Sequence, residues 1–410
     1  MKESNPLPTP GGHHRFHLLD ALRGLVSVLV VYLHAPAYLN LRAGHDTTLG
    51  VDFFFCLSGF VIAFSYERRL ALSLTFKQFL RARLIRLYPI YLFGLLEGTI
   101  SFLLVMVKFP LSIGDVGRLS ILFGLQTLIL PGFGVWKSHL LFPLNFPAWS
   151  MFFELLVNIA FAAAIRKKIA SNKALIATYA VSLALMIGLT TQYKGTDVGW
   201  GLNAGHLIGG TARVCLSFVA GVLILRYTRA NPRKSFSDRI SIFASLGIII
   251  ALLLILQSPH PVLRTKLFQL LAISSLLPAT VYLGSRCHVS KRLAPVCAFL
   301  GDISFPLYLI HAPIMVLFDL PAVKALLLRL PSLQPLVVPS VLLIAGTISY
   351  FVMTYYDLPV RAFLRRQQSL RSLIFHLPTA LTRQGSVSDR SEQGLGQRYR
   401  DEAAKHVAML

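Results

Sequence analysis

Two ionisable side chains share the first apolar stretch of this 410-residue sequence. Arg23 and His34 are eleven positions apart, so a helix places them within about 20° of one face and roughly 16 Å apart along its axis. Asp20 lies one turn before Arg23 and is its expected ion-pair partner. A neutral imidazole at membrane depth can accept a proton from a hydroxyl group, so His34 is a candidate general base. An isolated histidine can instead serve only to hydrogen-bond two helices.

Three more charged side chains fall within or at the edge of apolar stretches, where each costs roughly 2.5–3.5 kcal/mol to insert. Glu154 is expected about 7 Å below Trp149, which is itself an expected interfacial anchor. Asp52 lies at the outer end of the second stretch, and Arg213 lies in the outer half of the sixth. Arg213 is therefore the expected counter-ion of Glu154 or Asp52. A carboxylate such as Glu154 is expected to orient His34.

A group of arginines precedes the third long apolar stretch, in FLRARLIRLYPIYL. Arg83 and Arg86 are three positions apart and Arg81 is nearby, in an expected cytoplasmic loop that ends before Pro89 breaks the helical register. A guanidinium group matches a phosphate through two parallel hydrogen bonds, so these arginines are candidate ligands for a multiply phosphorylated molecule. The alternative is that they only mark the cytoplasmic side of the membrane.

Further polar side chains lie in the second and ninth stretches. Ser58 can bond backbone groups and Gly59 allows close helix approach, while His311 is either a ligand-binding or a structural histidine. By expected depth, the candidates form two layers. The inner, basic layer consists of Arg23, Arg81, Arg83 and Arg86. The outer layer of acid–base groups consists of His34, Asp52, Glu154, His311 and, beside them, Arg213.

The elements that must position these side chains are long apolar segments. The sequence is 55% hydrophobic and 14% charged, a balance that a bilayer accommodates and a soluble exterior does not. Stretches of spanning length fall at about 18–39, 51–66, 88–107, 149–165, 174–191, 206–225, 240–257, 266–283, 296–318 and 337–357. They predict an all-α integral membrane protein, a bundle of about ten transmembrane helices.

The net charge of +23 could suggest nucleic-acid binding, but its distribution favours a membrane topology. Basic residues gather after every second apolar stretch, as they do in cytoplasmic loops, so both termini are expected in the cytoplasm. To keep this pattern, the shorter apolar run at 118–131 must not cross; we expect it to be re-entrant or surface-lying within an outer loop, 108–148. No nucleic-acid partner is expected.

The chain is expected to divide into a cytoplasmic N-terminal segment, 1–17, a membrane domain, 18–360, and a basic, partly disordered cytoplasmic tail, 361–410, that could rest on anionic lipid. The four cysteines have no metal-like spacing, so no metal site is expected, and they are interpreted as small packing residues.

At these residues the sequence resembles the membrane-bound acyltransferase-3 family, which includes bacterial O-antigen and exopolysaccharide acetyltransferases. The features that carry the resemblance run in order from about residue 16 to 366. They are Arg23 with His34, FFFCLSGF, Arg83 with Arg86, Trp149-Ser150 with Glu154, SFPLYLIHAP, and Tyr356-Asp357-Leu358-Pro359. Asp357 stands where many relatives have glutamate. The further span and the hydrolase-like domain of larger relatives are not expected here.

The resemblance implies a bacterial inner-membrane O-acyltransferase with acyl-coenzyme A, such as acetyl-coenzyme A, as co-substrate and no tightly bound cofactor. The acceptor would be a hydroxyl of a polysaccharide or lipid-linked saccharide. His34, Glu154 and Arg23 are then the expected catalytic residues, with His34 acting as base or carrying the acyl group. Arg81, Arg83 and Arg86 would bind the coenzyme, and the expected substrate contacts are Asp52, Ser58, Trp149, Arg213 and His311. The alternative function is a transporter or flippase of a lipid-linked glycan, which would carry similar midplane charges.

Overall fold

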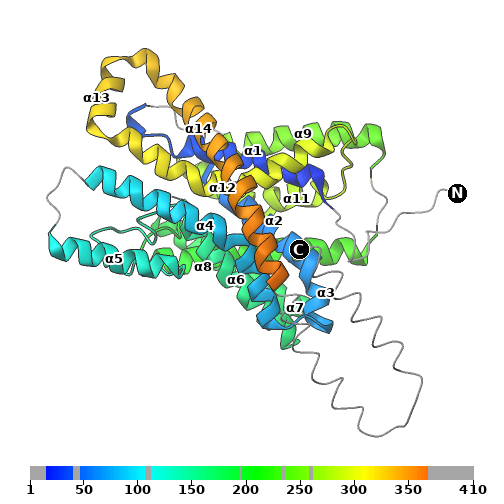
Figure 1. The fold of residues 1–410 in the computed structure, drawn as a ribbon. Helices are drawn as coiled ribbons and strands as arrows, with labels where there is room; N and C mark the ends of the chain where they lie inside the picture. The colour runs from blue at the N-terminus through cyan, green and yellow to red at the C-terminus, as the bar shows by residue number, and fades with distance from the viewer. Residues whose placement is uncertain are drawn as a thin grey trace, which may run out of the picture. The chain divides into compact units, whose positions relative to one another are not determined.

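The protein is an all-α membrane bundle. The computed structural model describes residues 15–39, 47–106, 112–193, 195–232, 236–257 and 262–367, and these residues contain helices and turns but no strand (Figure 1). Nine helical segments within these ranges are long and apolar enough to cross a membrane. The first helix, α1 (His17–Leu33), has 17 residues and lies at the lower limit of spanning length. The predicted fold class is therefore confirmed.

The remaining α-helices follow in chain order. They are α2 (Gly50–Ile62), α3 (Arg68–Leu72), α4 (Phe76–Met106), α5 (Ile113–Thr127), α6 (Ala148–Arg166), α7 (Asn172–Gln192), α8 (Ala204–Ala230), α9 (Asp238–Gln257), α10 (Val262–Leu271), α11 (Leu277–Gly284), α12 (Ala294–Val316), α13 (Pro321–Arg329) and α14 (Val337–Val352). Single π-helical turns join α2 to α3 at Ala63–Glu67 and α10 to α11 at Ala272–Leu276, and a third, Met353–Asp357, extends α14.

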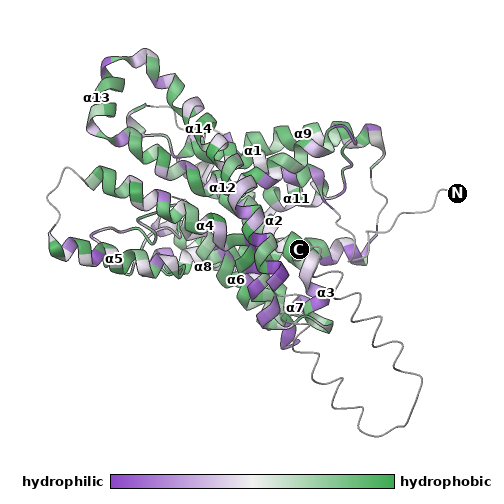
Figure 2. Cartoon of the chain, viewed as in Figure 1, coloured by the Kyte–Doolittle hydropathy of each residue, from purple (hydrophilic) through white to green (hydrophobic). Residues whose placement is uncertain are grey.

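Two compact units make up the chain, Met1–Pro359 and Val360–Leu410, and the candidate site lies in the first. Hydrophobic residues cover most of the length of the helices (Figure 2). Large apolar side chains such as Ile176, Val181 and Leu343 are exposed, as expected of helices whose outer faces meet lipid. The expected terminal segments 1–17 and 361–410 lie mostly outside the described residues.

Small residues let the central helices approach closely. In the first unit α1 packs along α12 and α2 packs along α8. A methyl group on Gly59 of α2 would collide with the Phe218 backbone of α8, and one on Gly221 of α8 would collide with the Cys56 carbonyl oxygen of α2. The predicted role of Gly59 is confirmed, since helix association in lipid depends on such close contacts.

The arginine motif does not lie in a loop, which corrects one expectation. Helix α4 begins at Phe76, so Arg81, Arg83 and Arg86 belong to its first turns, and the helix continues through Pro89 without a break. Membrane helices tolerate proline because neighbouring groups satisfy the carbonyl that it leaves without a donor. The arginines therefore sit deeper in the bundle than a loop would place them.

The run at 118–131 forms the last part of α5 and a turn that follows it. Ser112 begins this helix as a capping residue, and its side chain and that of Asp115 each accept the other's backbone N–H, at 3.1 Å in both cases. A helix of 15 residues is about 22 Å long, shorter than the ~30 Å hydrocarbon core. Its length favours the prediction that this segment does not cross the membrane.

Candidate active site

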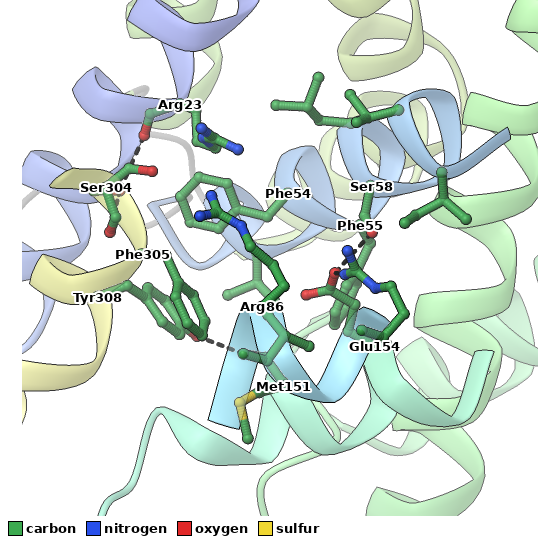
Figure 3. Close-up of a pocket in the computed structure, with 18 residues that line it drawn as sticks. Arg23, Phe54, Phe55, Ser58, Arg86, Met151, Glu154, Ser304, Phe305 and Tyr308 are labelled. Carbon is green, nitrogen blue, oxygen red and sulfur yellow. Dashed lines mark hydrogen bonds and ion pairs between the residues drawn. The ribbon is translucent and has the colours of Figure 1, made fainter. Parts of the chain in front are cut away.

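A cavity of about 210 Å³ lies among α1, α2, α4, α6 and α12, and we call it the arginine cavity. Arg23, Arg83 and Arg86 line it together with Glu154, so its charged lining is two units more positive than negative. Ser58, Ser150, Ser304 and several aromatic rings complete the wall. Figure 3 shows Arg86 extending from α4 toward Arg23 of α1, past Phe54. The structure thus brings together in one cavity five of the predicted site residues, which are Arg23, Ser58, Arg83, Arg86 and Glu154.

Arg23 is fixed by contacts on both sides of the α1–α12 interface. Its Nη2 atom donates to the Gly301 carbonyl oxygen at 2.6 Å and pairs with Asp20 Oδ1 at 3.2 Å, so the predicted Asp20 partner is confirmed. Arg15 binds Asp20 and also Asp302, at 2.7 Å, and the hydrogen bond to Asp302 raises the pKa of Arg15. This network holds Arg23 at the edge of the arginine cavity.

Glu154 lies with the arginines and not with the histidines. Its Oε1 atom accepts a hydrogen bond from Ser58 Oγ at 2.7 Å and pairs with Arg83 Nη2 at 3.1 Å (Figure 3). Glu154 is therefore found beside Ser58 and Arg83 and not, as expected, beside His34. The cause is the helical course of α4, which carries Arg83 inward to the depth of Glu154.

The α4 arginines do not all face the same way. Residues three apart on a helix share a face, whereas residues two apart point in nearly opposite directions. Accordingly Arg83 and Arg86 line the arginine cavity, and Arg81 is not among the described residues that do so. The predicted grouping of Arg81 with the other two is not found.

A second cavity, of about 440 Å³, lies at the other end of α1, and we call it the histidine cavity. His34, Thr48 and Asp197 supply its polar groups, and Trp149, Trp200 and Phe146 form aromatic walls. The predicted substrate contact Trp149 therefore lines this cavity. An apolar and aromatic lining with a few polar groups is typical of ligand pockets.

His34 is paired with His311, a contact that sequence analysis did not foresee. His311 Nδ1 lies 2.9 Å from the Leu307 carbonyl oxygen, so it carries the proton, and the neutral ring presents the lone pair of Nε2 to His34 Nδ1 at 3.1 Å. His34 Nδ1 also lies 2.9 Å from the Val30 carbonyl oxygen. Both of the described neighbours of His34 Nδ1 are acceptors, so His34 is protonated at Nδ1 and has its lone pair on Nε2. That tautomer is the one a base requires.

Prolines in α12 account for part of this geometry. Pro313 has no N–H to donate to the Leu309 carbonyl oxygen, and Asn145 Nδ2 donates to that oxygen instead, at 3.0 Å. The loop before α6 is thereby tied to α12 beside His311. His311 is fully buried and stands behind His34, outside the described cavity lining.

Asp52 and Arg213 form a buried ion pair. Arg213 Nε lies 2.9 Å from each carboxylate oxygen, Nη2 lies 2.7 Å from Oδ2, and the two side chains are 0% and 1% exposed. Of the two predicted partners of Arg213, Asp52 is the one found. The guanidinium group also bonds the Thr48 carbonyl oxygen and lies 5.6 Å from the Trp149 ring centroid. The pair supports the wall of the histidine cavity from behind and is not among the residues that line it.

Val51 and Tyr308 line both cavities, so these two side chains form the partition between them. Ser150 Oγ donates to the Pro147 carbonyl oxygen and accepts from the Tyr308 hydroxyl at 2.7 Å, which fixes the ring. Sequence reasoning missed Tyr308. Its spacing of three residues before His311 was the available signal, since such residues share a helix face.

The fold and these cavities define a multi-pass membrane protein with an arginine cavity and a histidine cavity back to back inside its bundle. The family model described as an acyltransferase domain, acyltransferase 3, matches residues 16–355. The chain belongs to this family of membrane acyltransferases. A curated relative, "Protein 2 in picA locus" of Rhizobium radiobacter, is 39% identical over 157 residues, which cover 36% of this chain and 81% of the relative. No solved structure matches the chain.

Proposed function

We propose that the protein is an O-acyltransferase that moves an acetyl or other acyl group from acyl-coenzyme A to a hydroxyl of a cell-surface polysaccharide or lipid-linked carbohydrate. The observation that carries this proposal is the pair of cavities that meet at Tyr308, with three arginines lining one and His34 lining the other. Membership of the acyltransferase family supplies the reaction class. The two cavities are the binding sites that we propose for the donor and the acceptor.

The arginine cavity suits the donor. Coenzyme A carries several phosphate charges, and Arg23, Arg83 and Arg86 bring three guanidinium groups to one cavity. Its volume of about 210 Å³ is below the roughly 300 Å³ at which ordinary ligand pockets begin. The thioester arm would therefore occupy the cavity, and the phosphates would lie at its mouth against Arg83 and Arg86. Glu154 positions Arg83 in this arrangement.

The histidine cavity suits a saccharide acceptor. The C–H faces of a sugar ring pack on aromatic side chains, and Trp149, Trp200 and Phe146 provide such surfaces next to the polar groups of Thr48 and Asp197. Its volume of about 440 Å³ admits one or two sugar units and leaves the remainder of a chain outside. An acceptor bound there presents a hydroxyl group to His34.

In the proposed reaction His34 Nε2 takes the proton from the acceptor hydroxyl as its oxygen attacks the thioester carbonyl carbon. When the tetrahedral intermediate collapses, the carbon–sulfur bond breaks, and the imidazolium returns the proton to the leaving thiolate. His311 holds the His34 tautomer through the 3.1 Å contact. The acyl end must pass Val51 and Tyr308, so these side chains control the approach of donor to acceptor. Transient acylation of His34 is the alternative route.

For the membrane orientation we propose that the arginine cavity faces the bacterial cytoplasm, where acyl-coenzyme A is made. The basic clusters that follow every second predicted span support this orientation and place both termini in the cytoplasm. The similar protein from Rhizobium radiobacter comes from a bacterium, which supports an inner-membrane location.

The test is transfer of radiolabelled acetyl from acetyl-coenzyme A into saccharide and lipid fractions of membranes that contain equal amounts of each variant. We expect His34→Ala to abolish incorporation. His139→Ala, which changes an exposed histidine outside both cavities, should leave it unchanged. Incorporation that is equal in both variants, or absent with a panel of acyl donors, would contradict the proposal and favour transport of a lipid-linked glycan.

A further inference from the structure

A third cavity, of about 510 Å³, lies where α3, the end of α6, the start of α7 and the end of α8 come together. Four cationic side chains and one carboxylate line it, which gives a net charge of +3: Arg68, Lys168, Arg226, Arg229 and Glu67. We call it the basic cavity. It shares no lining residue with the arginine or histidine cavity.

A π-helical turn builds one wall of the basic cavity. The turn at Ala63–Glu67 precedes Arg68, and such turns inside helices often mark functional sites. Glu67 pairs with Arg226 at 2.7 Å and with Arg229 at 3.3 Å. One carboxylate thus holds two guanidinium groups in fixed positions while leaving most of the positive charge of the cavity unbalanced.

The lining of the basic cavity also contains a residue in an unfavourable backbone conformation. Lys168 follows α6 with φ = 59°, in the left-handed region that glycine and asparagine enter more readily than lysine. Its N–H donates to the Ile165 carbonyl oxygen, and the Ile169 N–H donates to that of Ala164, both at 3.0 Å, so this conformation ends α6. A lysine here places a cation at the cavity.

The beginning of α7 adds to the positive potential. Ser171 lines the cavity and caps this 21-residue helix, accepting a hydrogen bond from the Ala174 N–H at 3.2 Å. The first turn of a helix presents N–H groups and the positive end of the helix dipole, which favour a bound anion. Four cations and a helix N-terminus therefore converge on one cavity.

The surroundings of the basic cavity distinguish a lipid from a soluble anion. Exposed apolar side chains continue along α7 from the cavity, at Ile176, Val181 and Leu185, and Ile169 is exposed beside Lys168. This surface suits acyl chains that run along a membrane helix from a headgroup at its end. Basic pockets between membrane helices on the cytoplasmic side bind anionic headgroups.

We infer that the basic cavity binds the phosphate-containing headgroup of an anionic phospholipid, with the acyl chains along α7. The phosphate oxygens accept hydrogen bonds from Arg68, Lys168 and Arg229, and Arg226 stays paired with Glu67. This site is independent of the acyl-transfer reaction, so its test needs no measurement of activity.

The test measures thermal unfolding of the purified full-length protein in an uncharged detergent as dioctanoyl phosphatidylglycerol is added. A ligand that binds the folded state raises the unfolding midpoint with concentration, which gives an apparent dissociation constant. The test variant is Arg68→Gln with Lys168→Asn, because asparagine tolerates the left-handed backbone. The matched control is Lys291→Gln with Arg292→Gln, which removes two exposed cations elsewhere.

We expect phosphatidylglycerol to stabilise the wild type and the control variant, and phosphatidylcholine to stabilise neither. Removing two cations that attract an anionic headgroup should weaken binding about 30-fold in the test variant. If this variant does not fold, Lys168→Asn alone gives the same comparison with a smaller loss of affinity for phosphatidylglycerol.

Three outcomes would overturn the inference. Equal stabilisation by glycerol 3-phosphate would assign the cavity to a soluble phosphate. A response to coenzyme A that the test variant loses would assign it to the acyl donor. Equal weakening of phosphatidylglycerol binding in the control variant would show that binding depends on overall charge and not on this cavity.

Discussion

Replacing Arg213 by methionine should lower the free energy of unfolding of the bundle more than the loss of an exposed charged side chain does. The substitution keeps an unbranched side chain but leaves Asp52, which is 1% exposed, as a carboxylate without its guanidinium partner. Removing one member of a buried ion pair costs about 3–5 kcal/mol. We expect a loss near the middle of that range, about 4 kcal/mol or roughly a thousandfold in the unfolding equilibrium.

The assay is unfolding of the purified protein by dodecyl sulfate in mixed micelles, followed by tryptophan fluorescence. Trp149 reports directly, since its ring centroid lies 5.6 Å from Arg213 Cζ. The double variant Asp52→Asn with Arg213→Met buries no charge and should recover more than half of the loss. The control is Arg118→Met. Arg118 pairs with Asp115 at 3.5 Å on an exposed surface, so this substitution should lower the free energy of unfolding by less than about 1 kcal/mol.

Two results would refute this reasoning. Equal losses of stability in Arg213→Met and Arg118→Met would show that burial does not increase the contribution of the Asp52–Arg213 pair to stability. A double variant as unstable as Arg213→Met would show that the unpaired carboxylate is not the cause. The same double variant also separates structure from substrate binding: if the pair only supports the cavity wall, the folded protein keeps its acyl transfer.

Three other predictions follow from the packing and the cavities. Gly221→Ala should sharply reduce the yield of folded protein, because the added methyl group collides with the Cys56 carbonyl oxygen. Gly188→Ala should not reduce the yield, because open space surrounds Gly188. Size-exclusion profiles measure the yield of both variants. Tyr308→Ala should open the partition and raise acetyl-coenzyme A hydrolysis without acceptor, measured as thiol release, while Tyr308→Phe keeps the ring and should leave hydrolysis at the wild-type rate. Arg86→Gln should raise the KM for acetyl-coenzyme A about tenfold with little change in kcat, and Arg81→Gln should change neither in steady-state kinetics. Normal yield of Gly221→Ala would contradict the described packing of α2 on α8, and slow hydrolysis in Tyr308→Ala or equal KM effects of the two arginines would contradict the proposed donor site.

Hydropathy was sufficient to predict the class of fold, and helical spacing was sufficient to predict contacts within one helix. The apolar stretches at 174–191 and 240–257 correspond closely to α7 and α9, because a bilayer requires about 20 apolar residues per span. The Asp20–Arg23 pair was predictable since residues three apart on a helix are neighbours. Family membership was likewise predictable from motifs that occur in order along the chain.

Contacts between helices were predicted less well, for a physical reason. In lipid both the exposed and the buried face of a helix are apolar, so hydropathy does not show which face points inward. The depth of Arg83 was misjudged because Arg83 was expected in a loop before Pro89 broke the helical register, whereas α4 runs from Phe76 through Pro89 and brings Arg83 to Glu154. The His34–His311 contact joins residues 277 positions apart and required the three-dimensional arrangement of α1 and α12.

The most direct test of the proposed transfer uses vesicles of defined orientation that contain the protein and a saccharide acceptor. Acetyl-coenzyme A does not cross membranes, so in the proposed orientation radiolabelled donor added outside would reach the arginine cavity only in inverted vesicles. We predict labelled acceptor in inverted vesicles with the wild type, none in inverted vesicles with His34→Ala, and none in right-side-out vesicles. Equal labelling in both orientations, or labelling that persists in His34→Ala, would contradict the account.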